Sequence, residues 1–173
     1  MIYIVRHGET DWNKEGKTQG HTNIPLNDNG IKQALEVKEK LKDVSFDKVF
    51  CSPLDRTIST AKIITDHEII LDDRLIERNN GIFEGKNKKE NDLFRKSVEN
   101  YNDEDYGVEP VEKLQERANN FLEEILPKYK NKNILIVTHG GLIINLRVYL
   151  EGPVDDFRKY MLGNCEVFMY NNN

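Results

Sequence analysis

Two runs of uninterrupted apolar residues constrain the fold of this chain more than any other feature. They are Ile2-Tyr3-Ile4-Val5 and Ile134-Leu135-Ile136-Val137. Strands without polar alternation are typical of a parallel sheet that is covered on both faces. Further strand candidates lie at 46–51, 68–71 and 165–170, and segments with helical periodicity separate most of the strands. This alternation predicts an α/β sandwich with a mostly parallel central sheet.

Four segments carry the helical pattern. Residues 31–41 place apolar side chains on one face, and 142–150 form an apolar helix candidate. Ser52-Pro53 resembles an N-cap followed by proline at the first helical position, which predicts a helix from there to about Asp66. The clearest amphipathic stripe runs from Leu114 to Leu126, with Pro127 near its end.

Two stretches are polar and irregular. Residues 8–29, rich in Gly, Asn, Asp and Thr, predict a long and functional loop. Residues 79–110 predict a variable cap segment that holds a short helix around 91–101. A chain of 173 residues without repeats or linkers fits a single domain spanning 1–173.

Composition narrows the partners and the compartment. The net charge of −5 and the absence of a basic stripe argue against nucleic acid as a partner. Neither a signal peptide at Met1–Val5 nor an apolar run of membrane-spanning length is present, so we expect a cytoplasmic protein without a membrane partner. A disulfide between Cys51 and Cys165 is possible, but their apolar surroundings favour reduced thiols in or near the core.

Chemically active residues follow four of the predicted strands. They are Arg6-His7-Gly8, then Ser52-Pro53-Leu54-Asp55-Arg56, then Glu77 a few residues after the third strand, and Thr138-His139-Gly140-Gly141. Ligands of such sheets bind outside the carboxyl ends of the strands. Two histidines, two arginines and a glutamate are therefore expected to converge at one edge.

This set of groups suits phosphoryl transfer. Arginines bind phosphate oxygens through charge-assisted hydrogen bonds, and a neutral imidazole can accept the phosphoryl group covalently. A second histidine can donate to the phosphoryl oxygens, and a carboxylic acid can protonate the leaving oxygen. Positive side chains would make a magnesium ion unnecessary, so we expect no metal and no cofactor.

Other interpretations are weaker. Each residue alone has an ordinary explanation as a core, loop or surface side chain, and His21 and His67 are expected to be such loop or surface residues. A metal-dependent hydrolase is disfavoured because arginines beside the two histidines would repel a cation. The sequence has no P-loop pattern.

An ordered set of motifs resembles the histidine phosphatase superfamily, which includes the phosphoglycerate mutase-like proteins. The matching segments are Arg6-His7-Gly8-Glu9-Thr10 with Trp12-Asn13, Pro25-Leu26 with Gly30, Ser52 to Thr57, Glu77-Arg78 with Gly81 and Glu84-Gly85, and Thr138 to Gly141. The resemblance covers essentially the whole chain. It implies a three-layer α/β/α sandwich that acts on a small-molecule phosphomonoester.

The resemblance also implies residue roles. His7 would become the phosphohistidine, and Glu77 would act as general acid and then as base for water. The remaining residues implied to bind the phosphoryl group or substrate are Arg6, Asn13, Gln19, Gly20, Arg56, His139 and the backbone of Gly140. The oligomeric state, monomer or homodimer, stays open.

Departures from the glycolytic mutases favour the phosphatase branch. The mutases carry paired arginines in an insertion after the acid motif, where this chain offers only Arg95-Lys96. They also tend to have tyrosine at the position of Asn80 and asparagine at that of Gly141. Phosphoglycerate mutase activity remains the alternative enzyme, and a non-catalytic phospho-ligand binding module remains the alternative of another class.

Overall fold

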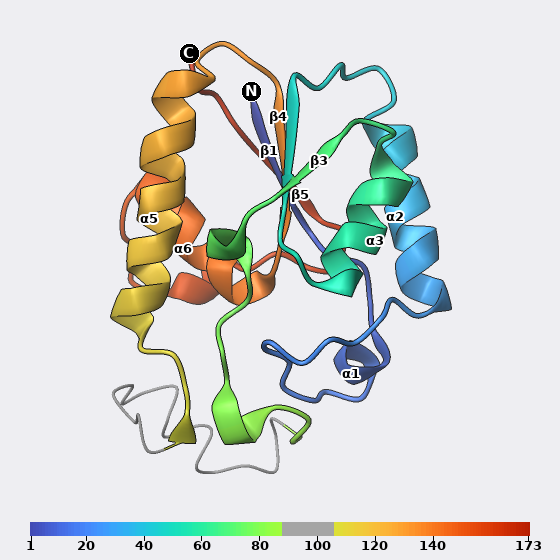
Figure 1. The fold of residues 1–173 in the computed structure, drawn as a ribbon, viewed down its shortest axis with the longest axis vertical. Helices are drawn as coiled ribbons and strands as arrows, with labels where there is room; N and C mark the ends of the chain where they lie inside the picture. Colours follow the sequence, from blue (N-terminus) through green and yellow to red (C-terminus); the bar gives the residue numbers. More distant parts are fainter. Residues whose placement is uncertain (88–105) are drawn as a thin grey trace.

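The computed structural model describes residues 1–87 and 106–173, which form a three-layer α/β/α sandwich (Figure 1). The sheet has five strands in the order β3-β2-β4-β1-β5. They are β1 (Ile2–Arg6), β2 (Lys48–Cys51), β3 (Ile69–Leu71), β4 (Ile134–Thr138) and β5 (Val167–Tyr170). The first four are parallel, and β5 pairs antiparallel with β1 at the sheet edge. The predicted mostly parallel α/β sandwich is confirmed.

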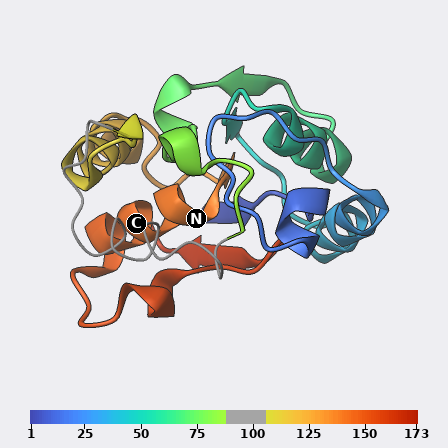
Figure 2. The same cartoon turned by 90° about the horizontal axis from the view of Figure 1, so that it is seen from below.

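Helices cover both faces of the sheet, as Figure 2 shows. Helices α2 (Asp28–Lys40) and α3 (Asp55–Ile64) lie on one side, and α5 (Val111–Lys128) and α6 (Gly140–Glu151) on the other. Alternate residues of β1 and β4 therefore enter different cores. Ile2, Ile4, Ile134 and Ile136 pack with α5 and α6, whereas Tyr3, Val5, Leu135 and Val137 pack with α2 and α3. Burial on both faces explains why these strands lack polar alternation.

Two local predictions were wrong. The stretch 8–29 is not loop throughout, because α1 (Asp11–Lys14) interrupts it, with Thr10 and Asn13 forming a capping box. Helix α3 begins at Asp55 after the N-cap Leu54, and not at Ser52-Pro53. The Ser52 hydroxyl lies 2.7 Å from His139 Nε2 and accepts from the Leu54 amide at 3.5 Å.

Three short 3₁₀ helices complete the described fold, at η1 (Asp73–Leu75), η2 (Gly81–Phe83) and η4 (Phe157–Tyr160). The predicted helix around 91–101, with Arg95-Lys96, lies outside the described residues. Cys51 and Cys165 are free and buried, as predicted. Across residues 1–87 and 106–173, every helix is too short or too polar to cross a bilayer.

Candidate active site

The register of β1 and β4 brings the two His-Gly segments side by side. Arg6 pairs with Thr138, and the His7 amide donates to the Thr138 carbonyl at 3.0 Å. Both strands end there, so the imidazoles of His7 and His139 project from neighbouring strand ends. Their ring centroids are 5.2 Å apart, and both side chains are buried.

His7 is held in one tautomer. Its Nδ1 atom lies 2.7 Å from the Gly8 carbonyl oxygen, which can only accept a hydrogen bond. Nδ1 therefore carries the proton, and Nε2 has the lone pair. Burial, followed by the charges of Arg56 and Arg6, holds the pKa of His7 well below its usual value, so the ring is neutral at pH 7.

Arg56 is a fully buried cation at the start of α3. Its two terminal nitrogens donate to the carbonyls of Thr22, at 2.9 Å, and Gly20, at 2.7 Å. Burial lowers the pKa of this guanidinium from its ordinary value to about 10. Within the part of the chain that the structure describes, no carboxylate forms an ion pair with it. A buried charge without a direct counter-ion is a strong anion attractor.

Arg6 is only partly buried, but it too has no ion-pair partner among residues 1–87 and 106–173. Its Nη1 atom donates to the Leu162 carbonyl at 2.8 Å, while its buried Nε has no partner among the described residues. Gly140 lies against the guanidinium, since a Cβ there would be 3.5 Å from the Arg6 Cζ. The first turn of α6 and the Arg6 guanidinium thus border the same place, and both favour an anion.

His139 links Arg56 to the end of β2. Arg56 Nε donates to His139 Nδ1 at 3.3 Å, and Nε2 lies 2.7 Å from the Ser52 hydroxyl. Since a guanidinium only donates, the neutral ring carries its proton on Nε2. Burial, and then the positive charge of Arg56, holds the pKa of His139 well below its usual value.

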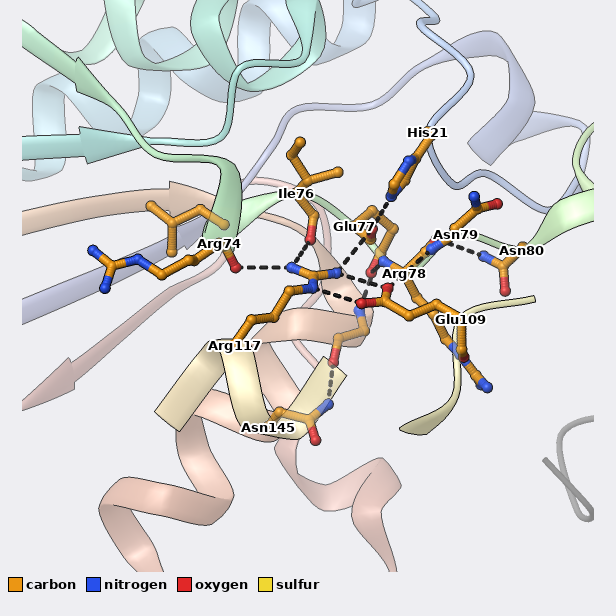
Figure 3. Close-up of polar contacts among 12 residues, drawn as sticks. His21, Arg74, Ile76, Glu77, Arg78, Asn79, Asn80, Glu109, Arg117 and Asn145 are labelled. Atoms are coloured by element: carbon orange, nitrogen blue, oxygen red, sulfur yellow. Dashed lines mark hydrogen bonds and ion pairs between the residues drawn. The ribbon is translucent and has the colours of Figure 1, made fainter. Parts of the chain in front are cut away.

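Glu77 reaches the site from the irregular segment after η1 (Figure 3). Its carboxylate accepts from the amide of Arg78 at 2.9 Å and from the amide of Gly141 at 3.1 Å. A side chain at position 141 would displace the Glu77 carboxylate from this place, because a Cβ there would lie 2.5 Å from a Glu77 oxygen. The Glu77 charge acts on Arg6 and Arg56, where it opposes the lowering of their pKa values by burial.

The segment 8–22 carries the remaining predicted residues. Asn13 Oδ1 accepts from Thr10 and Asn164, and Gln19 Oε1 accepts from the Thr10 hydroxyl. The Gly20 carbonyl accepts from Arg56, and a Cβ on Gly20 would lie 2.0 Å from a Glu84 oxygen. Hydrogen bonds thus connect Gly20, Arg56 and His139 in one network. Arg6 and Gly140, both among the described residues, lie next to one another without a hydrogen bond between them. Exposed His67 is outside this network, whereas exposed His21 donates from Nε2 to the Glu77 carbonyl at 2.9 Å.

Sequence reasoning missed several residues that hold this network. Thr60 accepts from the Gly8 amide and donates to the Arg56 carbonyl, and Asn164 donates to the His7 carbonyl. Glu84 was named in the motif comparison but without a role; it accepts from the amides of His21, Thr22 and Asn80. Burial alone raises the pKa of Glu84, but hydrogen bonds led by Thr22 outweigh it and lower the pKa overall. The Thr10-to-Asn13 spacing was a usable capping signal, whereas contacts to backbone groups leave no pattern in the sequence.

Comparison with known proteins decides the family. The model of the histidine phosphatase superfamily (branch 1) matches residues 2–171. The chain belongs to this superfamily. Among its relatives, the uncharacterized phosphatase PhoE of Bacillus subtilis is 38% identical over 168 residues, which cover 95% of this chain and 84% of PhoE. Phosphoglycerate mutase-like protein 4 of Arabidopsis thaliana is also 38% identical, over 84% of this chain and 68% of that protein.

A solved phosphatase structure agrees with the fold. The phosphoserine phosphatase of Entamoeba histolytica, in complex with 3-phosphoglyceric acid, superimposes with a TM-score of 0.82. It is 32% identical, and the match covers 96% of this chain and 87% of that one. Relatives named as phosphatases support an enzyme that acts on small phosphorylated substrates.

Proposed function

We propose that this protein hydrolyses small phosphomonoesters through a phosphohistidine on His7, without a metal ion. The observation that carries the proposal is the state of His7: it is neutral, it presents the lone pair of Nε2, and the charges of fully buried Arg56 and partly buried Arg6 act on it. A nucleophile that needs no deprotonation, next to cations without direct counter-ions, is suited to attack an anionic phosphoryl group.

The proposed reaction has two steps. The Nε2 lone pair of His7 forms a bond to phosphorus, the bond from phosphorus to the leaving oxygen breaks, and protonated Glu77 gives its proton to that oxygen. In the second step a water molecule attacks phosphorus and gives a proton to the Glu77 carboxylate. The N–P bond breaks, its electron pair returns to Nε2, and inorganic phosphate leaves.

The other residues stabilise the transferred group. Arg6 and Arg56 neutralise its charge, and the first turn of α6 at Gly140 offers backbone N–H groups. Oδ1 of Asn13 already accepts several hydrogen bonds, so Asn13 would bind an oxygen through Nδ2. Gln19, Gly20 and His139 would complete the binding site for the phosphoryl group. These cations supply the positive charge that a metal ion provides in other phosphatases.

A phosphate-release assay with EDTA present tests the reaction. The panel contains p-nitrophenyl phosphate, phosphoserine, and 3-phosphoglycerate with 2,3-bisphosphoglycerate, with His7→Ala as the control. Metal-free release that this variant loses, together with an acid-labile phosphoryl label on His7, is the expected result. Isomerisation of 3-phosphoglycerate without release would identify a mutase, and no turnover of any substrate would favour a binding module.

The variant Glu77→Gln tests the role of Glu77 as general acid separately from the role of His7 as nucleophile. The proton matters when the leaving oxygen is a poor leaving group, such as the alkoxide of phosphoserine, and matters little for p-nitrophenolate. We therefore expect this variant to slow phosphoserine more than p-nitrophenyl phosphate. Equal losses on both substrates would remove Glu77 from the role of acid.

A further inference from the structure

Arg117, on α5, forms hydrogen bonds to the main chain at and just before Glu77 (Figure 3). Its Nη1 atom donates to the carbonyls of Arg74, at 2.8 Å, and Ile76, at 2.5 Å, and its Nη2 atom donates to the Glu77 carbonyl at 3.1 Å. The segment from Arg74 to Glu77 includes the end of η1 and the irregular chain after it. One guanidinium thus satisfies three carbonyls in a part of the chain with little secondary structure to hold it.

Glu109 fixes Arg117 in this position. Its two carboxylate oxygens accept from Nε at 2.7 Å and from Nη2 at 2.9 Å, in a bidentate pair. Both side chains are largely buried, with 19% and 16% exposed. Glu109 also accepts from the amide of Asn79 at 3.2 Å, and Asn79 follows Glu77 in the chain. Arg117 and Glu109 thus contact the main chain both before and after Glu77. This planar fork of donors has no equivalent in a lysine side chain.

We propose that Arg117, supported by Glu109, is a positioning residue for the general acid Glu77. This inference rests on the proposed function of the site. The carbonyl of Glu77 is held by Arg117 and His21, and its carboxylate by the amides of Arg78 and Gly141. Loss of the Arg117 contacts would free the carbonyls of Arg74, Ile76 and Glu77, so the main chain that leads into Glu77 would be less firmly held. Since a misplacement of about 1 Å costs about 100-fold in rate, proton transfer would suffer first.

Arg74 provides a matched control. Its guanidinium forms ion pairs with Asp72 and Glu124 and donates to the Asn120 carbonyl on α5, and it points away from Glu77 in Figure 3. Arg74 and Arg117 therefore both join η1 to α5, but only Arg117 contacts Glu77. Arg74→Met keeps the backbone carbonyl that Arg117 uses.

The test compares two substrates in the full chain. Arg117→Met, Arg117→Lys and Glu109→Gln are assayed on phosphoserine and p-nitrophenyl phosphate, alone and combined with Glu77→Gln. We expect kcat on phosphoserine to fall about 10- to 100-fold and kcat on p-nitrophenyl phosphate less than about 3-fold. The loss should vanish in the Glu77→Gln background, and Arg74→Met should leave the ratio of the two substrates unchanged.

Other results overturn the inference in distinguishable ways. Equal losses on both substrates, or an undiminished loss in the Glu77→Gln background, would leave Arg117 a merely structural role while the phosphatase reaction stands. Wild-type protein that releases phosphate from neither substrate would refute the proposed function, and this role with it. If Arg117→Met does not fold, the Arg117→Lys and Glu109→Gln variants decide by the same ratio.

Discussion

Arg56 and His139, both fully buried, share a hydrogen bond of 3.3 Å from Nε to Nδ1. The bond fixes the guanidinium at one end, and the carbonyls of Gly20 and Thr22 hold the other end. No ion pair within residues 1–87 and 106–173 neutralises Arg56. The protein thus keeps a preorganised positive charge beside His7, the proposed nucleophile.

Arg56→Met should weaken anion binding more than it weakens the fold. A charge-assisted hydrogen bond contributes about 1.5–3 kcal/mol, so we expect KM to rise about 10- to 100-fold. Vanadate should raise the melting temperature of the wild type but not of this variant. Lys62→Met, an exposed change on the same helix, is the control and should respond as the wild type does. An undiminished vanadate effect in Arg56→Met would show that Arg56 does not bind the anion.

Gly141→Ala should separate activity from stability. A methyl group there would lie 2.5 Å from a Glu77 carboxylate oxygen and displace it, whereas alanine in a helix is about 0.5–1 kcal/mol more favourable than glycine. We expect lower turnover of phosphoserine with unchanged or higher stability in urea. Gly140→Ala is the comparison, because its Cβ meets the nearest Arg6 atom at an ordinary 3.5 Å. Full activity of Gly141→Ala would mean that the position of Glu77 is not critical.

The two buried histidines should make the protein less stable as the pH falls below about 6.5. Their pKa values are lowered in the folded state by burial and by nearby arginines. As the pH falls, the unfolded chain therefore binds protons at these histidines before the folded chain does, which favours unfolding. In the window between the folded and unfolded pKa values, each histidine contributes about 1.4 kcal/mol per pH unit. Urea unfolding at pH 7 and pH 5.5 measures this slope. His7→Asn should reduce it and exposed His67→Gln should not, and an unchanged slope in His7→Asn would contradict the assignment.

The two cysteines should be unreactive in the native protein. Burial raises the pKa of each thiol to about 12, so almost no thiolate is present at pH 8. Titration with a thiol reagent should detect neither cysteine in the folded state and both in urea. Cys51→Ala should retain phosphatase activity, because the proposed mechanism uses no thiol. Rapid labelling of native protein would show that the core opens near β2 or β5.

The sequence by itself determined the architecture and the candidate residues of the site. Apolar runs such as Ile134–Val137 required burial on both faces, which leads to a parallel sheet between helix layers. In such a sheet the residues after each strand meet at one edge, so the sequence alone places His7, Arg56 and His139 near one another.

Only the tertiary structure decided how these residues are held. Arg56 and Arg117 donate mostly to backbone carbonyls. Because every residue carries a backbone carbonyl, the residue types in the sequence do not indicate which of them these arginines contact. Ser52 resembled a helix cap, but the helix begins at Asp55, and the shorter hydrogen bond of the Ser52 hydroxyl joins it to His139 from a distant segment. Local patterns reveal bonds within a few residues, whereas the tautomer of each histidine, the charge balance of the arginines and the support of Glu77 depend on atoms that meet only in the folded chain.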